Sequence, residues 1–134
     1  MGDFGELLGI LTIILFGIAI SNYLVKFVNR NWGKQIAKYP RLKSVWTLFM
    51  RFIVKYHRYF GVAALLTLGL HFYIQSTFVY LSTSGILAGS LLLTQFALGV
   101  YGAYVNKKRK GFWFIAHRTI SALLLIAILN HVLF

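Results

Sequence analysis

The chain has few of the residues that form cross-links, end helices or carry negative charge in soluble domains. Its 134 residues include no cysteine, one proline and only two acids. The lack of cysteine excludes disulfides, thiolate-bound metals, iron–sulfur clusters and covalently attached c-type haem. Residues 59–106, a run of 48, contain no Asp, Glu, Lys or Arg. The whole chain is 59% hydrophobic, which is too apolar for a soluble domain of this size.

Long apolar runs make up most of the chain. A bilayer span needs about 20 apolar residues, so the uncharged run holds two spans and a turn. Residues 7–25 and 112–134 provide two more. We therefore expect an all-α integral membrane protein of one domain, residues 1–134, whose four helices form an up-down-up-down bundle. The expected helices cover residues 7–28, 44–75, 86–106 and 112–134.

The fourteen basic residues predict the orientation of these helices. Nine lie in residues 26–58 and five in residues 107–118. Because basic residues gather in cytoplasmic loops, both termini are expected outside the cytoplasm, in a plasma or inner membrane. We expect residues 29–43 to form an interfacial loop and KKRKG, at 107–111, to form a tight turn. Since acids precede the first apolar run and Lys26 follows it, this run is expected to be a retained helix rather than a signal peptide.

The only four histidines of the chain occur at matched positions. HRYFGVAALLTLGLH runs from His57 to His71, and HRTISALLLIAILNH runs from His117 to His131. Fourteen residues make four turns at about 3.5 residues per turn, so each pair shares one helix face, with about 21 Å between its members. Ionisable residues inside a membrane are costly and usually functional. The second and fourth helices are expected to be parallel, which places His57 level with His117 and His71 level with His131.

Two histidines at each level favour one kind of cofactor. A small metal ion would need three or four ligands, and no cysteine or acid lies near either level. A haem iron needs only two axial ligands from the protein, because the porphyrin supplies the others. The sequence therefore predicts two non-covalent b-type haems, one held by His57 and His117 and the other by His71 and His131.

Small residues and arginines near the histidines are further candidates for cofactor binding. Gly61 lies one turn after an inner histidine, and Gly85 and Gly99 are fourteen residues apart on the third helix. Such residues either leave room for a macrocycle or simply let membrane helices approach. Arg58 and Arg118 directly follow the inner histidines. They either bind haem propionates or snorkel to the interface.

The paired motifs HRYFGVAALLTLGLH and HRTISALLLIAILNH resemble the di-haem core of membrane cytochromes b and of ferric reductase/NADPH oxidase-like transmembrane domains. The resemblance covers about residues 44–134. It implies transmembrane electron transfer in a redox complex or a quinone or acceptor reductase, with His57, His71, His117 and His131 as axial ligands. The flavin and nicotinamide domain of ferric reductases and the quinone-site loops of quinone-oxidising cytochromes b are not found in these residues.

Two other functions remain open from the sequence. One is a proton or metal-ion transporter with a histidine relay, although such relays usually include carboxylates and the predicted spans contain none. The other is a structural anchor, which leaves the matched histidines unexplained. The expected partners are the lipid bilayer and a cytoplasmic flavoprotein or iron–sulfur protein, a quinone or an external acceptor, but not nucleic acid. The basic face suits an acidic redox protein or anionic lipid, and the chain is expected to be an electron-transfer subunit rather than a stand-alone enzyme.

Overall fold

The computed structural model describes residues 2–106 and 111–134, which are almost entirely helical. The elements are α1 (Gly2–Ile36), α2 (Pro40–Phe78), α3 (Thr83–Val100), η1 (Tyr101–Val105) and α4 (Phe112–Leu133). η1 is a π-helical turn that directly continues α3. Each of the four helices, with η1 counted as part of α3, is long and apolar enough to cross a membrane. The prediction of an all-α, multi-pass membrane protein is thus confirmed for the described residues.

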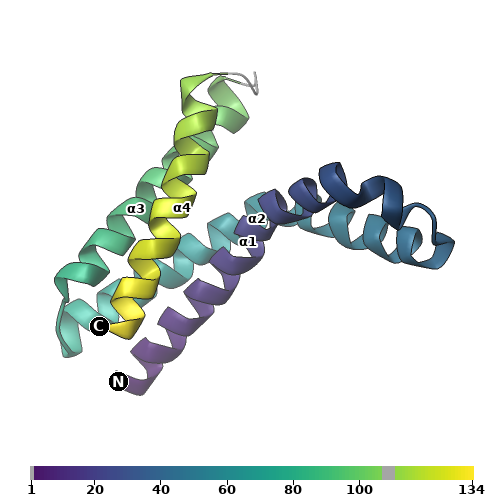
Figure 1. Cartoon of the computed structure of the whole chain (residues 1–134). Helices are drawn as coiled ribbons and strands as arrows, with labels where there is room; N and C mark the ends of the chain where they lie inside the picture. The colour runs from purple at the N-terminus through teal and green to yellow at the C-terminus, as the bar shows by residue number, and fades with distance from the viewer. Residues whose placement is uncertain (1, 107–110) are drawn as a thin grey trace.

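The helices are arranged as two hairpins (Figure 1). α1 packs along α2, and α3 packs along α4, whereas contacts between the hairpins are far fewer. Figure 1 shows the two hairpins together at one end, where both termini and the α2–α3 turn lie, and diverging toward the other end. The two hairpins are therefore closest at the end that carries the termini.

The prediction of a long loop between the first two helices is wrong. α1 continues to Ile36 and α2 begins at Pro40, so only three residues separate them. Proline is compatible with the first turn of a helix, where its missing N–H needs no intrahelical partner. Pro40 occupies this position in α2, so it begins a helix and does not mark a loop. The predicted KKRKG turn, except for Gly111, lies outside the described residues.

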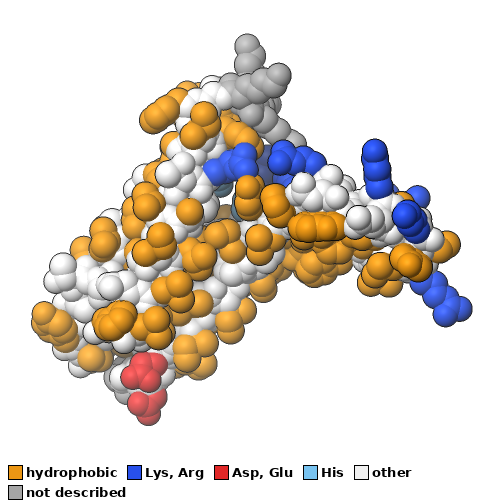
Figure 2. Space-filling model, in the orientation of Figure 1, with side chains coloured by type: hydrophobic (Ala, Val, Ile, Leu, Met, Phe, Trp, Pro, Cys, Tyr) orange, Lys and Arg blue, Asp and Glu red, His pale blue; other side chains and the backbone are white. Residues whose placement is uncertain are grey.

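α1 and α2 are longer than a bilayer requires. At about 1.5 Å per residue they measure about 52 Å and 58 Å, against a hydrocarbon core of about 30 Å. Residues 26–58 of this hairpin, here called the basic arm, hold nine of the fourteen Lys and Arg residues. Figure 2 shows the basic side chains along this arm and near the point where the hairpins diverge, with the acidic side chains at the opposite end.

A thin apolar layer forms the core of the molecule. Phe16 of α1, Leu92 of α3 and Leu124 of α4 pack together as a buried cluster. Ala64 of α2 is only 1% exposed. Most other large apolar side chains are exposed, as expected for helices whose outer faces contact lipid.

Candidate functional site

The four histidines come together as the two pairs that their spacing predicts. The ring centres of His57 and His117 lie 6.4 Å apart, with an angle of 83° between the ring planes. Those of His71 and His131 lie 6.5 Å apart, with an angle of 71°. All four side chains are half-buried. Each pair, called here the inner and the outer pair respectively, joins the α1–α2 hairpin to the α3–α4 hairpin.

A seven-residue spacing places the core layer between the two pairs. Ala64 lies midway along α2 between its two histidines, and Leu124 lies midway along α4 between the other two. Leu92 is likewise midway between Gly85 and Gly99 on α3. Positions that repeat every seven residues stay on one face of packed helices. Because Leu124 is 0% exposed and Ala64 only 1%, apolar side chains separate the inner pair from the outer pair.

α1 orients the histidines of α2 through its backbone carbonyls. The Nδ1–H of His57 donates to the carbonyl oxygen of Ala19 (2.9 Å), and that of His71 donates to the carbonyl of Gly5 (2.7 Å). A carbonyl only accepts, so the proton lies on Nδ1 and the lone pair of Nε2 is left for a metal, as in most metal-bound histidines. A side chain at Gly9 would be too close to this arrangement, because its Cβ would lie 3.1 Å from Cε1 of His71.

Two of the three predicted glycines lie against the histidines of α4. A Cβ at Gly85 would be 3.0 Å from Cε1 of His131, and a Cβ at Gly99 would be 3.4 Å from Cε1 of His117. A Cβ at Gly61 would meet nothing within 4 Å. Gly85 and Gly99 therefore make room for imidazole rings, whereas Gly61 faces open space.

At the outer pair, α3 provides hydroxyl groups beside the histidine of α4. The Oγ atoms of Ser82 and Ser84 lie 3.2 Å and 3.1 Å from Nδ1 of His131. A hydroxyl oxygen can accept the Nδ1 proton. Since His71 already donates from its Nδ1, both rings of the outer pair can present Nε2 as a ligand.

At the inner pair, the histidine of α4 has a different neighbour. The Nε2–H of Gln95 donates to Nε2 of His117 (3.2 Å), and the same amide nitrogen donates to Oγ of Ser121. Gln95 is only 8% exposed. Its Oε1 and the Nδ1 of His117 are buried without a hydrogen-bond partner. The inner pair thus combines one ring whose Nε2 is ready to bind a metal with one whose Nε2 contacts an amide.

The two predicted arginines lie in different surroundings. The guanidinium of Arg118 lies 4.5 Å from the ring centre of Tyr23 and 5.5 Å from that of Phe114. The cation–π contact with Tyr23 links α4 to α1 next to the inner pair, and that with Phe114 lies within α4. Arg58 is exposed on α2. Both guanidinium groups are thus on the side of the inner pair, and no Lys or Arg occurs in residues 59–106 or 119–134 around the outer one.

Several residues beside the histidines were not found from the sequence. Two of them act through the backbone, and three act through polar side chains. They are Gly5, Ala19, Ser82, Ser84 and Gln95. One signal was present, because Gly5 and Ala19 are fourteen residues apart, the same separation as the histidines of α2. The serines lay in a segment expected to be a turn, where hydroxyl residues are ordinary.

The spacing of each pair fits an iron held between two imidazoles. With a metal–nitrogen bond of about 2.0–2.1 Å, and about 1.1 Å more to each ring centre, two ligands on opposite sides of one ion have ring centres about 6.3 Å apart. The observed values are 6.4 Å and 6.5 Å. Among the described residues, no group of three or more His, Asp or Glu side chains could hold a metal ion. The residues therefore fit a haem, whose macrocycle supplies the other ligands, better than a metal ion bound by protein alone.

Comparison of the chain with protein-family models, with curated proteins and with solved structures gives no match. The functional argument accordingly depends on the two histidine pairs and the groups that orient them.

Proposed function

We propose that the chain is a di-haem cytochrome b that transfers electrons across the membrane, similar in its core to cytochrome b and ferric reductase-like transmembrane domains. The observation that carries this proposal is the pair of facing imidazoles at two heights, with ring centres 6.4 Å and 6.5 Å apart. Two levels separated by fourteen residues lie about 21 Å apart along the helices. This distance covers most of a hydrocarbon core of about 30 Å.

In this proposal each part of the site has a physical task. His57 and His117 hold the inner haem, and His71 and His131 hold the outer one. When bound, a haem supplies reversible one-electron chemistry. The α1 carbonyls fix the imidazole tautomer of the α2 histidines, and such partners also raise the basicity of the ligand. Arg58 and Arg118 would bind the propionates of the inner haem.

The charge distribution supports an orientation with the basic arm in the cytoplasm and both termini outside. An electron donor such as an acidic flavoprotein or iron–sulfur protein would then approach the inner pair, and a quinone or external acceptor could react at either end. The chain would act as the electron-transfer subunit of a redox complex in a plasma or inner membrane. A reporter enzyme that is active only in the cytoplasm, fused after Phe134, should be inactive. Full activity of this fusion would reverse the orientation.

The arrangement supports a proton or metal-ion transporter less well. A relay across the membrane needs exchangeable groups between its two ends. The positions midway between the histidines on α2 and α4 are Ala64 and Leu124, which cannot carry a proton. Other polar contacts near this height are the hydrogen bond between the hydroxyls of Thr12 and Thr67 (2.8 Å) and that between the Gln95 amide and the Ser121 hydroxyl, and none of these groups is ionisable at ordinary pH.

Reconstituted vesicles test the proposed function. Haem-loaded protein is placed in liposomes that contain trapped ferricyanide, and dithionite is added outside. The protein should reduce the trapped ferricyanide much faster than protein-free vesicles do. The His71→Ala protein should lose this activity, because one of the two levels is broken. If the wild-type rate equals that of empty vesicles while a trapped pH dye shows rapid proton leakage, the transporter is favoured instead.

A further inference from the structure

The basic arm is a defined helical hairpin rather than a loose basic segment. Ile53 is buried, at 4% exposure. The indole N–H of Trp46 on α2 donates to the side-chain oxygen of Asn29 on α1 (3.1 Å). These contacts hold the two helices of the arm together, so side chains on its surface keep fixed relative positions.

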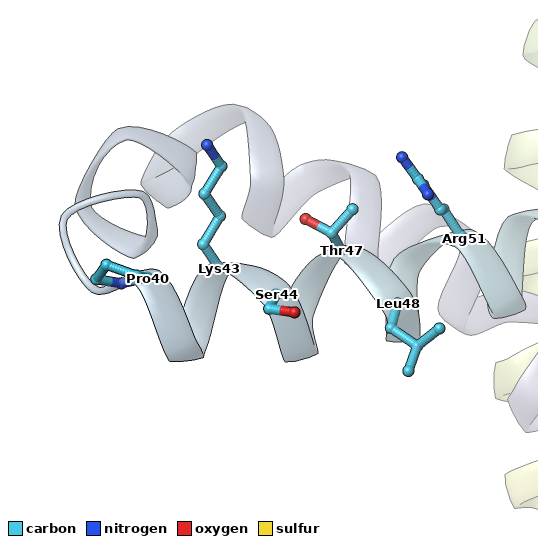
Figure 3. Close-up of a pocket in the computed structure, with 6 residues that line it drawn as sticks. All are labelled: Pro40, Lys43, Ser44, Thr47, Leu48 and Arg51. Atoms are coloured by element: carbon cyan, nitrogen blue, oxygen red, sulfur yellow. The ribbon is translucent and has the colours of Figure 1, made fainter.

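One stretch of the arm gathers groups that bind phosphate. A shallow, open surface pocket, here called the groove, lies along the first three turns of α2 (Figure 3). It is lined by Pro40, Lys43, Ser44, Thr47, Leu48 and Arg51. Lys43, Thr47 and Arg51 follow one another at intervals of four residues, which places them on one helix face, and Figure 3 shows all three pointing to the same side of α2.

No carboxylate of the chain can neutralise this groove. The only acids are Asp3 and Glu6, which lie at the opposite end of the molecule from the arm (Figure 2). An ammonium and a guanidinium with hydroxyls between them match the oxygens of a phosphate group, because guanidinium binds phosphate through two parallel hydrogen bonds. The positive charge of the groove would therefore attract an anionic ligand from outside the chain.

Exposed apolar side chains beside the groove favour lipid as the source of this phosphate. Leu48 is 72% exposed and Val45 is 66% exposed, and Phe49 and Phe52 are each 48% exposed. A basic helix that also exposes aliphatic and aromatic side chains is typical of a segment lying in the headgroup layer of a membrane. The arm is also the continuation of two helices that are long and apolar enough to span a membrane, so it begins where these helices would leave the bilayer.

We propose that the groove lined by Lys43, Ser44, Thr47 and Arg51 binds the phosphate of an anionic phospholipid in the inner leaflet, while Leu48 contacts the acyl region. This site is independent of haem binding. It would hold the basic arm along the membrane surface and so fix the position of the α1–α2 hairpin at the inner end.

Lipid binding by the full-length protein tests this proposal. Delipidated protein in mixed micelles is titrated with dioleoyl phosphatidylglycerol or with dioleoyl phosphatidylcholine, and bound lipid is counted by native mass spectrometry. The wild type should prefer the anionic lipid. The double variant Lys43→Gln/Arg51→Gln should lose affinity for it about twentyfold, at about fivefold for each cation.

A matched control separates a site from diffuse charge attraction. The double variant Arg30→Gln/Lys34→Gln removes the same two charges from the α1 side of the arm, outside the groove, and should lose less than about threefold, because exposed charges that make no direct contact with the lipid contribute little. Equal losses in the two double variants would overturn the proposal, and so would a wild type that binds both lipids alike. Displacement of the lipid by millimolar inorganic phosphate would also overturn it, because the groove would then recognise free phosphate rather than a lipid.

Discussion

The inner and outer pairs have the same ring spacing but different surroundings. At the outer pair each imidazole has its Nδ1 beside an acceptor, Gly5 on one side and the hydroxyls of Ser82 and Ser84 on the other. At the inner pair only His57 has such a partner, and Gln95 contacts Nε2 of His117. No Lys or Arg occurs in residues 59–106 or 119–134 around the outer pair, whereas Arg58 and Arg118 directly follow the inner histidines. Repeated spacing thus provides two equivalent positions, and the neighbouring residues make them chemically different.

The difference suggests separate tasks for the two levels. An outer pair with two oriented imidazoles, and with no Lys or Arg in residues 59–106 or 119–134 around it, would favour strong and permanent ligation. An inner pair with arginines and an amide nearby is better suited to tuning and to contact with a charged partner. Each of the following substitutions changes one histidine pair, and the other pair of the same molecule serves as the internal control.

Removal of a ligand should have the largest effect. His57→Ala and His117→Ala should each abolish the inner haem and leave the outer one, because one remaining imidazole cannot complete the axial pair. His71→Ala and His131→Ala should abolish the outer haem in the same way. Redox titration of the haem absorption bands identifies which haem is lost. If His57→Ala and His71→Ala removed the same haem, the pairing across the hairpins would be wrong.

Filling the space at Gly9 should weaken the outer haem about tenfold, the lower end of the effect expected for groups that support metal ligands. A Cβ at this position would lie 3.1 Å from the ring of His71, so Gly9→Val must displace the imidazole. Gly17→Val is the matched control on the same helix, because a Cβ there meets nothing within 4 Å. Haem titration of the apoproteins measures both affinities. Similar losses of haem affinity in the two variants would mean that the substitutions disturb α1 as a whole and not the local packing around His71.

Replacing Gln95 should change only the inner haem. The amide donates a hydrogen bond to the nitrogen of His117 that would bind iron, so Gln95→Leu removes a competing interaction. One hydrogen bond contributes about 1 kcal/mol, so haem affinity at the inner level should rise about fivefold. The His71→Ala background, which retains only the inner site, allows this affinity to be measured alone. A fall in affinity would show that Gln95 supports His117 rather than competing for it.

Neutralising Arg118 should have the smallest effect. Reduction adds an electron to a haem, so a nearby cation stabilises the ferrous state and raises the midpoint potential. Because Arg118 is exposed, its contribution is screened, and Arg118→Gln should lower the inner potential by only about 20 mV. The outer potential should stay unchanged in the same titration. An equal shift of both potentials would mean that the substitution acts through the fold and not through the local charge.

The sequence predicted the number of helices and the levels of the histidines because these depend on strong, periodic signals. An apolar run of 48 residues and two separations of fourteen residues leave few alternatives. Basic residues and Pro40 between Asn29 and Lys43 are common in loops, so the sequence predicts a loop there. Neither feature prevents a helix, and α1 and α2 cover most of this segment. The roles of Gly5 and Ala19 could not be predicted from residue type because every residue carries a backbone carbonyl, and only their separation of fourteen residues gives a signal. Gln95 was overlooked because one polar residue in an apolar helix has many possible explanations.

The haem content of the purified protein tests the central claim most directly. A pyridine haemochrome assay, combined with protein determination by amino-acid analysis, gives the number and type of haems per chain. The account predicts two non-covalent b haems per chain, both low-spin because each iron has two imidazole ligands. One haem or none per chain, after expression with sufficient haem supply, would contradict it.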